Sequence, residues 1–225
     1  MKINIQQIPL SEALPWILKK HYAHRKCPVS FAFGAFRDNK LIGIVTYGTP
    51  FSPTLRIGIC GEKYADIILE LNRLCCVNEK NIASRLIGQS LRLLSKPSIV
   101  VSYADTKMHH IGYVYQATNF YYTGLSAKRT DWKVKGQENK HGGTIADQSR
   151  GKENRAQWMR EKYGDDFYLE DRPRKHRYVY FCAKNIKQKA EMFNALRYEV
   201  IPYPKGESTH YKCDCEIISQ GVLSI

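Results

Sequence analysis

Residues 69–120 read LELNRLCCVNEKNIASRLIGQSLRLLSKPSIVVSYADTKMHHIGYVYQATNF, and four elements follow one another in this stretch. Apolar and polar side chains alternate over Leu69–Cys76, which predicts a half-buried strand. Over Ala83–Leu94 the apolar residues recur at the three- and four-residue spacing of a helix face. Ile99–Asp105 is a short β-branched run that ends in a carboxylate, which is typical of a buried parallel strand. A last helix is predicted over Gly112–Thr118, and it leads into an aromatic strand.

Shorter elements are predicted on both sides of this stretch. On the N-terminal side they are a first strand, a helix with Ser11 as its N-cap and Pro15 in its first turn, and a hairpin: Lys2–Ile5, Ser11–Arg25, and Phe31–Arg37 with Leu41–Tyr47. On the C-terminal side they are a strand, a helix and an extended strand around Tyr203: Tyr178–Ala183, Ile186–Tyr198 and Pro202–Pro204. The sequence therefore predicts an α/β fold with a mixed, mostly antiparallel central sheet flanked by helices.

Three regions are expected along the chain. Residues 1–125 form the core, residues 178–225 complete it, and residues 126–177 form an insertion rich in Lys, Arg, Gly, Asn and Gln. The insertion shows little periodicity apart from a short helix around Gln157–Arg160, so we expect part of it to become ordered only on nucleic acid.

The charge of the chain favours an anionic partner. The formal net charge is +14, the sequence pI is about 9.4, and aromatic residues make up 12% of the chain. Cations mixed with stacking side chains favour double-stranded DNA or another nucleic acid, whereas a basic surface without a specific ligand is the alternative. The densest basic run ends the insertion, and its residues Arg172, Arg174, Lys175 and Arg177 are predicted to contact phosphates. A solvated charge run remains the other interpretation.

The sequence predicts a cytoplasmic, reduced protein. It holds no apolar run of the ~20 residues that a bilayer requires. Its seven cysteines are odd in number and have no repeated spacing. Cys213-Asp214-Cys215 offers two thiols for a metal or an oxidant, but an ordinary reduced tail is favoured because no second pair stands at zinc spacing.

Motifs in one order along most of the chain resemble a known family. The arrangement ending in Tyr115-Gln116-Ala117-Thr118-Asn119-Phe120 is similar to the central half of the GNAT acyltransferase fold. The closer resemblance is to the Mom family of phage DNA-modification proteins. It rests on Tyr47–Pro50, Ser52–Arg56, Glu70–Leu74, Ser102–Asp105, Tyr113–Phe120, Lys175–Phe181 and Pro202–Pro204.

The resemblance implies a transferase that places a carbamoylmethyl-type (methylcarbamoyl) group on the exocyclic amine of adenine in phage DNA, which protects that DNA from host restriction. Asp105 lies at the carboxyl end of a buried strand, where ligands gather, and it is predicted to accept a proton or to orient a group. Tyr115 resembles the GNAT tyrosine that protonates the leaving group. His21 and Tyr22 match a His-Tyr pair of the Mom family, so they are candidates for handling the base. The alternative for this pair is a basic helix end without a function.

The predicted donor site comprises Arg73, Ser84 and Ser102. Arg73 lies on the strand that leads to the predicted helix, and Ser84 lies in the first turn of that helix, where the helix N-terminus attracts anions. Here the chain departs from GNAT enzymes that use coenzyme A. It has Asn78, Asn81 and Ala83 where those enzymes have Arg or Gln, Gly, and Gly or Ala. Acyl-CoA and aminoacyl-tRNA are therefore both open as donors. Iron is open as a cofactor, with His21 and Asp105 as candidate ligands, and a homodimer is open as the oligomeric state.

Two other classes of function stay open. One is an acyl-CoA-dependent N-acyltransferase acting on a protein or a small amine. The other is a non-catalytic DNA-binding protein on a GNAT scaffold.

Overall fold

A computed structural model of the chain describes residues 3–22, 24–140 and 142–206, together with the strand segments 211–212, 217–219 and 222–223. The chain forms two units. The larger unit comprises Met1–Leu125 and Lys175–Ile225, and the smaller unit comprises Ser126–Arg174. Lys175, His176 and Arg177, which were expected in the insertion, lie in a strand of the larger unit. The motif at Cys213–Cys215 lies outside the described residues.

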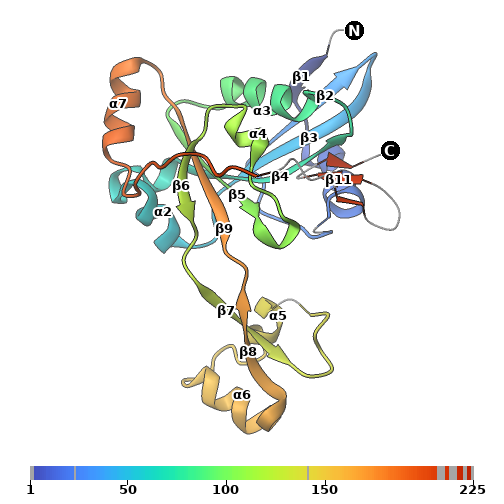
Figure 1. Cartoon of the computed structure of the whole chain (residues 1–225), viewed down its shortest axis with the longest axis vertical. Coiled ribbons are helices and arrows are strands. Elements are labelled where there is room, and N and C mark those ends of the chain that lie inside the picture. Colours follow the sequence, from blue (N-terminus) through green and yellow to red (C-terminus); the bar gives the residue numbers. More distant parts are fainter. Residues whose placement is uncertain are drawn as a thin grey trace. The chain divides into compact units, whose positions relative to one another are not determined.

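The larger unit is built on one sheet (Figure 1). Its main strands are β1 Asn4–Gln7, β2 Phe31–Arg37, β3 Lys40–Gly48, β4 Ile68–Val77, β5 Ser98–Asp105, β6 Tyr121–Leu125 and β9 Lys175–Cys182. These strands pair in the order β1, β2, β3, β4, β5, β9, β6. All the pairs are antiparallel except β4 with β5. Three short strands continue from β4, namely β12 Val222–Leu223, β11 Ile217–Ser219 and β10 Tyr211–Lys212. The predicted mixed, mostly antiparallel sheet is confirmed.

Helices cover both faces of this sheet. They are α1 Leu10–Pro15, the π-helix η1 Trp16–Lys20, α2 Pro53–Cys60, the 3-10 helix η2 Glu62–Ile67, α3 Ile82–Leu93, the 3-10 helix η3 Thr106–Met108, α4 Tyr113–Gln116 and α7 Ile186–Asn194. Alternate residues of β4 and β5 point to opposite faces, as the pleat of a strand requires. Leu71 and Val100 join the core under α3, whereas Ile68 and Val101 join the core under α2 and α7. Among the described residues, no helix is both long and apolar enough to cross a bilayer.

Several predicted elements differ in detail from the observed ones. Ser11 lies inside α1, whose N-cap is Pro9, and Pro15 ends α1 where the chain changes to π-helical geometry. Tyr203 does not lie in a strand, because the prolines on either side of it lack the N–H groups that a ladder needs. Its hydroxyl instead donates to the carbonyl of Phe120 at 2.7 Å.

The smaller unit has its own sheet and its own core. Its elements are β7 Arg129–Val134, α5 Gly142–Asp147, α6 Arg155–Tyr163, the 3-10 helix η4 Gly164–Asp166 and β8 Phe167–Arg172. β7 and β8 pair antiparallel, and Val134, Ile145 and Met159 are buried together. The short helix predicted around Gln157–Arg160 is confirmed as α6, and the unit also holds two paired strands, β7 and β8, that the sequence pattern did not indicate.

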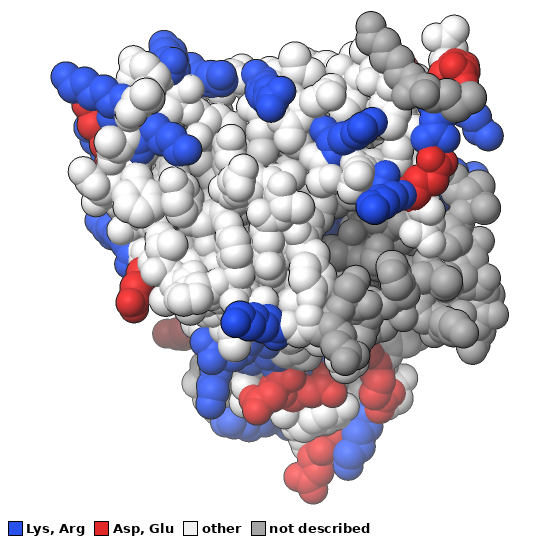
Figure 2. Space-filling model, turned by 45° about the horizontal axis from the view of Figure 1, so that its top comes forward, with Lys and Arg blue, Asp and Glu red and all other residues white. Residues whose placement is uncertain are grey.

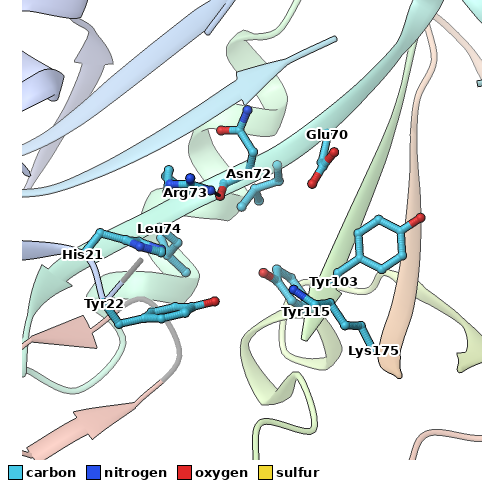
Figure 3. A pocket seen from close by; sticks show the side chains of 10 residues that line it. His21, Tyr22, Glu70, Asn72, Arg73, Leu74, Tyr103, Tyr115 and Lys175 are labelled. Carbon is cyan, nitrogen blue, oxygen red and sulfur yellow. Dashed lines mark hydrogen bonds between the residues drawn. The ribbon is translucent and has the colours of Figure 1, made fainter. Parts of the chain in front are cut away.

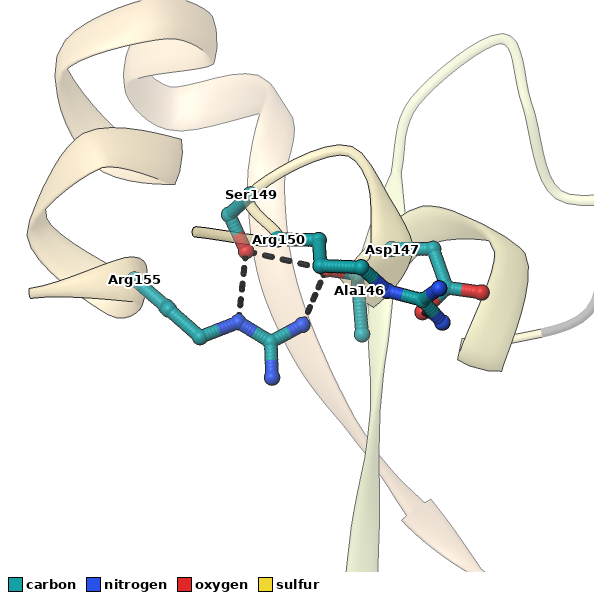
Figure 4. A network of polar contacts seen from close by, with 5 residues as sticks. All are labelled: Ala146, Asp147, Ser149, Arg150 and Arg155. Carbon is teal, nitrogen blue, oxygen red and sulfur yellow. Dashed lines mark hydrogen bonds and ion pairs between the residues drawn. The ribbon is translucent and has the colours of Figure 1, made fainter. Parts of the chain in front are cut away.

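An arginine joins the two helices of the smaller unit (Figure 4). The guanidinium of Arg155, at the start of α6, donates to the hydroxyl of Ser149 at 3.1 Å and to the carbonyl of Ala146. Arg150 pairs with Asp147 at 2.8 Å. Both helices are short, so these contacts supply part of the order that helix propensity alone does not give.

The charge excess is uneven between the units. Twelve Lys and Arg against nine Asp and Glu give Ser126–Arg174 a net charge of +3, so +11 of the chain's +14 belongs to the larger unit. On the face shown in Figure 2, Lys and Arg side chains of the larger unit outnumber Asp and Glu. The insertion is therefore not the main source of the basic character.

Candidate active site

The parallel strands β4 and β5 separate part of the way along their length. They are in register only from Ile68 opposite Ile99 to Leu71 opposite Ser102. Beyond that point β5 stays paired with β9, and β4 stays paired with β3. At the same place β4 bulges, since Arg73 is opposite Thr46 and Leu71 is opposite Tyr47, which leaves Asn72 as the extra residue. We call this separation after Leu71 and Ser102 the fork.

A polar pocket occupies the fork (Figure 3). Its lining comes from the end of the first helical segment, from β4 and β5, from α4 and from the start of β9: His21, Tyr22, Glu70, Leu71, Asn72, Arg73, Leu74, Tyr103, Tyr115 and Lys175. Figure 3 shows the Tyr22 hydroxyl and the Glu70 carboxylate pointing into the same space. Segments far apart in the sequence thus deliver acids, bases and phenols to one point.

Asn72 fixes one wall of the pocket. Its side-chain oxygen accepts a hydrogen bond from the hydroxyl of Thr46 at 2.6 Å, and its amide nitrogen donates to the carbonyl of Pro28 at 2.6 Å. Because both ends of the amide are held, the bulge has one defined geometry. The neighbouring Arg73 guanidinium donates to the carbonyls of Asn72 and Arg25, at 2.6 and 3.0 Å, and so places its positive charge at the pocket.

Tyr115 brings a buried phenol to the fork. Its side chain is 3% exposed, and its ring lies against those of Phe120 and Tyr178, with centroids 5.4 and 5.2 Å away. Burial raises the pKa of Tyr115, and a hydrogen bond with Ser102 opposes that rise. The Ser102 hydroxyl also donates to the carbonyl of Leu71 at 3.0 Å, across the base of the fork. The phenol is therefore protonated at neutral pH and can donate its proton.

Glu70 and Lys175 bring a carboxylate and an ammonium group to the pocket, and Asp105 pairs with Lys175. Lys175 Nζ is 3.0 Å from Asp105 Oδ2. Burial raises the pKa of Glu70, while the charges of Lys175 and Arg73 oppose that rise. A carboxylate whose pKa is raised toward neutrality is better suited to exchange a proton than an exposed one.

His21 and Tyr22 form a stacked pair of rings at the edge of the pocket. Their centroids are 4.4 Å apart, and Tyr22 also meets His110 edge-on at 6.2 Å. Burial, followed by the charge of Arg73, lowers the pKa of His21 to about 3. Burial and the charge of Asp105 raise the pKa of Tyr22. Both side chains are therefore neutral at pH 7, which suits contact with an uncharged aromatic ring.

The fork gathers most of the residues that the sequence suggested. His21, Tyr22, Arg73 and Tyr115 line the pocket, Ser102 lies at its base, and Asp105 is joined to it through Lys175. Ser84 is not among the lining residues. It lies in the first turn of α3, where its hydroxyl donates to the carbonyl of Asn81 at 3.2 Å.

Glu70 and Asn72 were missed. In a regular alternating strand, both residues would lie on the side that faces solvent. Only the bulge and the fork direct their side chains toward a pocket. Lys175, which is predicted to contact DNA phosphates, lines the pocket.

Arg177, a predicted phosphate contact, is buried. It is 8% exposed, and its guanidinium donates to the hydroxyl and the carbonyl of Thr123, both at 2.9 Å. It also lies over the ring of Tyr198, 3.4 Å from the centroid. The prediction for Arg177 was wrong, because a run of cations in a sequence does not reveal which one the following strand turns inward.

The other two members of that basic run have protein partners as well. Arg172 pairs with Asp131 at 3.3 Å across the β7–β8 sheet, and Arg174 donates to the carbonyl of Ser126 at 2.6 Å. Both side chains are partly exposed. Both arginines therefore stabilise the smaller unit by these contacts.

The described residues do not fit an iron site. Nowhere among them do three or more His, Cys, Asp or Glu side chains gather as metal ligands. His21 and Asp105, the two candidates, do not belong to such a group. No step of the chemistry is assigned to iron.

Similarity to known proteins was found at the level of family, sequence and fold. The model of the Mom protein family matches residues 2–205. A relative named methylcarbamoylase mom, from Escherichia phage Mu, is 28% identical over 211 residues, which is 91% of this chain and 84% of that protein.

Two solved structures are similar to this chain in fold. Arabidopsis thaliana NAA60 in complex with acetyl-CoA has a TM-score of 0.47 and 14% identity, and the match covers 80% of this chain and 98% of that one. An N-acetyltransferase from Staphylococcus aureus Mu50 has a TM-score of 0.42 and 14% identity, with 81% and 99% covered.

Proposed function

The chain belongs to the Mom protein family, and from that premise we propose that it is a transferase that adds a carbamoylmethyl-type (methylcarbamoyl) group to the exocyclic amine of adenine in DNA. The observation that supports this proposal is the fork. It brings a protonated phenol, a partly buried carboxylate and a guanidinium to one pocket. Such a set can remove a proton from an amine and return one to a leaving group.

The acceptor side needs a base and a platform. The exocyclic amine of adenine is a weak nucleophile, so its proton must leave as the new N–C bond forms. We assign the acceptance of that proton to Glu70, which lines the pocket and has a raised pKa. Asp105 pairs with Lys175 and holds it beside Glu70, so Asp105 acts as a positioning residue. The stacked rings of His21 and Tyr22 offer a flat, neutral surface for the base.

The donor side needs an acid and an anchor. As the bond between the transferred group and its carrier breaks, the carrier takes a proton from the Tyr115 hydroxyl. Arg73 supplies a positive charge for a carbonyl or an anionic part of the donor. Ser102 positions Tyr115.

The donor is of the acyl-CoA or the aminoacyl-tRNA kind. Asn81, which replaces the first glycine of the coenzyme A motif, has φ 67° and so adopts the left-handed conformation that glycine favours. The turn before α3 thus keeps a glycine-like backbone. The Arg or Gln that leads the motif is still replaced by Asn78, so both donors stay within the proposal. If coenzyme A binds, the first turn of α3 with Ser84 would hold its phosphates.

The test is mass spectrometry of nucleosides from plasmid DNA of cells that express the wild-type chain or Tyr115→Phe. The wild type should yield a heavier adenine, whereas Tyr115→Phe, which keeps the buried ring, should lower its yield at least ~100-fold. Thermal unfolding of the purified variant serves as the control for folding.

The outcomes separate the competing functions. Modified adenine from the wild type alone supports the proposal and the role of the Tyr115 hydroxyl. Equal yields from both proteins would remove Tyr115 from the chemistry. Unmodified adenine from the wild type, together with acylation of a protein or small amine from acyl-CoA, would favour the N-acyltransferase. Unmodified adenine with salt-sensitive DNA retention would favour a binding protein.

A further inference from the structure

Two large apolar side chains among the described residues are almost fully exposed. Phe51 is 87% exposed and Ile186 is 88% exposed. Leaving a Phe side chain in water forgoes the stabilisation that its burial would contribute. Ile186 is the first residue of α7. Phe51 lies in the loop between β3 and α2, and its exposure is the more unusual of the two.

The loop holds Phe51 outward, because the residues on both sides of it are fixed. Pro50 is buried. Ser52 is the N-cap of α2, and its hydroxyl accepts a hydrogen bond from the backbone N–H of Leu55 at 3.2 Å. Pro50 and Pro53 also restrict the backbone on either side. Both neighbours of Phe51 are thus anchored in the fold.

This loop leaves the sheet at the wall of the pocket. Gly48, the last residue of β3, is in register with Glu70. A Cβ atom added to Gly48 would lie 2.0 Å from the carbonyl oxygen of Pro28 and 3.0 Å from Nδ2 of Asn72. Glu70 and Asn72 both line the pocket. Phe51 follows Gly48 by three residues, which limits the separation of their Cα atoms to about 11 Å.

The partner that fits an exposed ring beside this pocket is double-stranded DNA. The larger unit carries a net charge of +11, which attracts a polyanion. An adenine in a duplex is stacked and paired, so it must leave the helix before it can enter a pocket. Proteins that open a base step commonly insert an apolar side chain between the bases.

We propose that Phe51 is a wedge that enters the base stack of duplex DNA beside the target adenine and fills the space that the extruded base leaves. This inference rests on the proposed function, since it names how the substrate reaches the fork. The ring makes no covalent bond. It contributes by keeping the neighbouring bases stacked on an aromatic face while adenine is out of the helix.

The experiment compares Phe51→Ala, Phe51→Trp and the matched control Ile186→Ala, all in the full-length chain. Each replaces a side chain that is almost wholly in water, so folding should be unchanged. The first readout is the fluorescence of a duplex with 2-aminopurine in place of adenine, which rises when that base leaves the stack. The second is the yield of modified adenine on a duplex and on the same strand left single.

We expect the wild type, Ile186→Ala and Phe51→Trp to raise the fluorescence, and Phe51→Ala to leave it at the level of free duplex. Phe51→Ala should modify the duplex at least ~10-fold less than wild type but the single strand within ~2-fold, because extrusion is then unnecessary.

Three results would overturn the wedge. They are wild-type behaviour of Phe51→Ala on the duplex, an equal loss on duplex and single strand, and no fluorescence rise with any protein. If the wild type raises the fluorescence in a Phe51-dependent way but modifies no adenine, the proposed function fails and the wedge stands.

Discussion

Glu70 keeps a carboxylate in surroundings that favour its neutral form. Burial raises its pKa above the ordinary glutamate value, and only Lys175 and Arg73 oppose that shift. A carboxyl group with a raised pKa in the folded state binds its proton more tightly there than in the unfolded chain. Stability therefore falls as pH rises from the unfolded pKa through the folded one, and it recovers at lower pH.

The first prediction concerns Glu70→Gln, which keeps the shape but not the charge. At pH 8 the variant should unfold at a higher temperature than the wild type, and the difference should shrink as pH falls and wild-type Glu70 takes up its proton. The variant should also lose adenine modification, because an amide cannot accept the amine proton. Thermal unfolding from pH 4 to pH 8 and nucleoside mass spectrometry measure the two effects.

Glu79→Gln is the control for stability. Glu79 is exposed, and its pKa is lowered by the hydrogen bond from Arg37, so its stabilising effect should instead be lost at low pH. A Glu70→Gln protein that is less stable at pH 8, or that still modifies adenine, would remove Glu70 from the role of base.

Single residues also show how far sequence reasoning reached. His21, Tyr22, Arg73 and Tyr115, which the sequence motifs singled out, all line one pocket. Glu70 was not predicted as a site residue, because the direction of its side chain depends on the bulge at Asn72, and no local sequence pattern indicates that bulge. Arg177 looked like any other cation in a basic run until its contact with Tyr198 showed it to be interior.

The fork is an element-scale device, and its edges depend on close backbone approach. Gly48 ends β3 against Pro28, where an added Cβ would meet a carbonyl oxygen at 2.0 Å. A backbone group cannot move aside as the end of a flexible side chain can. Gly88 lies inside α3, and an added Cβ there would meet nothing within 4 Å.

The second prediction is a matched pair of glycine substitutions. Gly48→Ala should destabilise the protein by about 2 kcal/mol or more, a fall in melting temperature of roughly 5 °C. Gly88→Ala should stabilise it by about 0.5–1 kcal/mol, because alanine loses less backbone entropy in a helix. Denaturant unfolding of both variants measures the two signs, and a stable Gly48→Ala protein would show that the pocket wall is not tightly packed.

Elements with a clear period were predicted best. β4, α3 and β5 follow the alternation and the helical spacing that their sequences show. α2 was not predicted, although Pro53 stands at the start of that helix, where proline is tolerated. The π-helical turn η1 was missed as well, since it differs from an α-helix only in the hydrogen bonds that its backbone makes.

At the scale of the whole molecule, the chain enters and leaves the smaller unit at neighbouring points. Leu125 at the end of β6 is in register with His176 near the start of β9. The smaller unit also has its own buried residues and its own sheet. Its removal should therefore leave the larger unit intact.

The third prediction is that replacing Ser126–Arg174 by a short turn between Leu125 and Lys175 leaves a cooperatively folding protein. The deletion removes a net charge of +3 out of +14, so most of the salt-sensitive retention on DNA should remain. Circular dichroism during heating and DNA retention between 50 and 200 mM salt measure both effects. Loss of nearly all retention would make the insertion the principal DNA contact, and loss of cooperative unfolding would make it part of the core.

The adjacency of Leu125 and His176 has an evolutionary consequence. A segment whose two ends meet on paired strands can lengthen, shorten or be exchanged between lineages while the rest of the fold keeps its geometry. Selection on what that segment touches can then proceed separately from selection on the pocket. The sequences of relatives should accordingly differ most between these two strands and change only slowly around the fork.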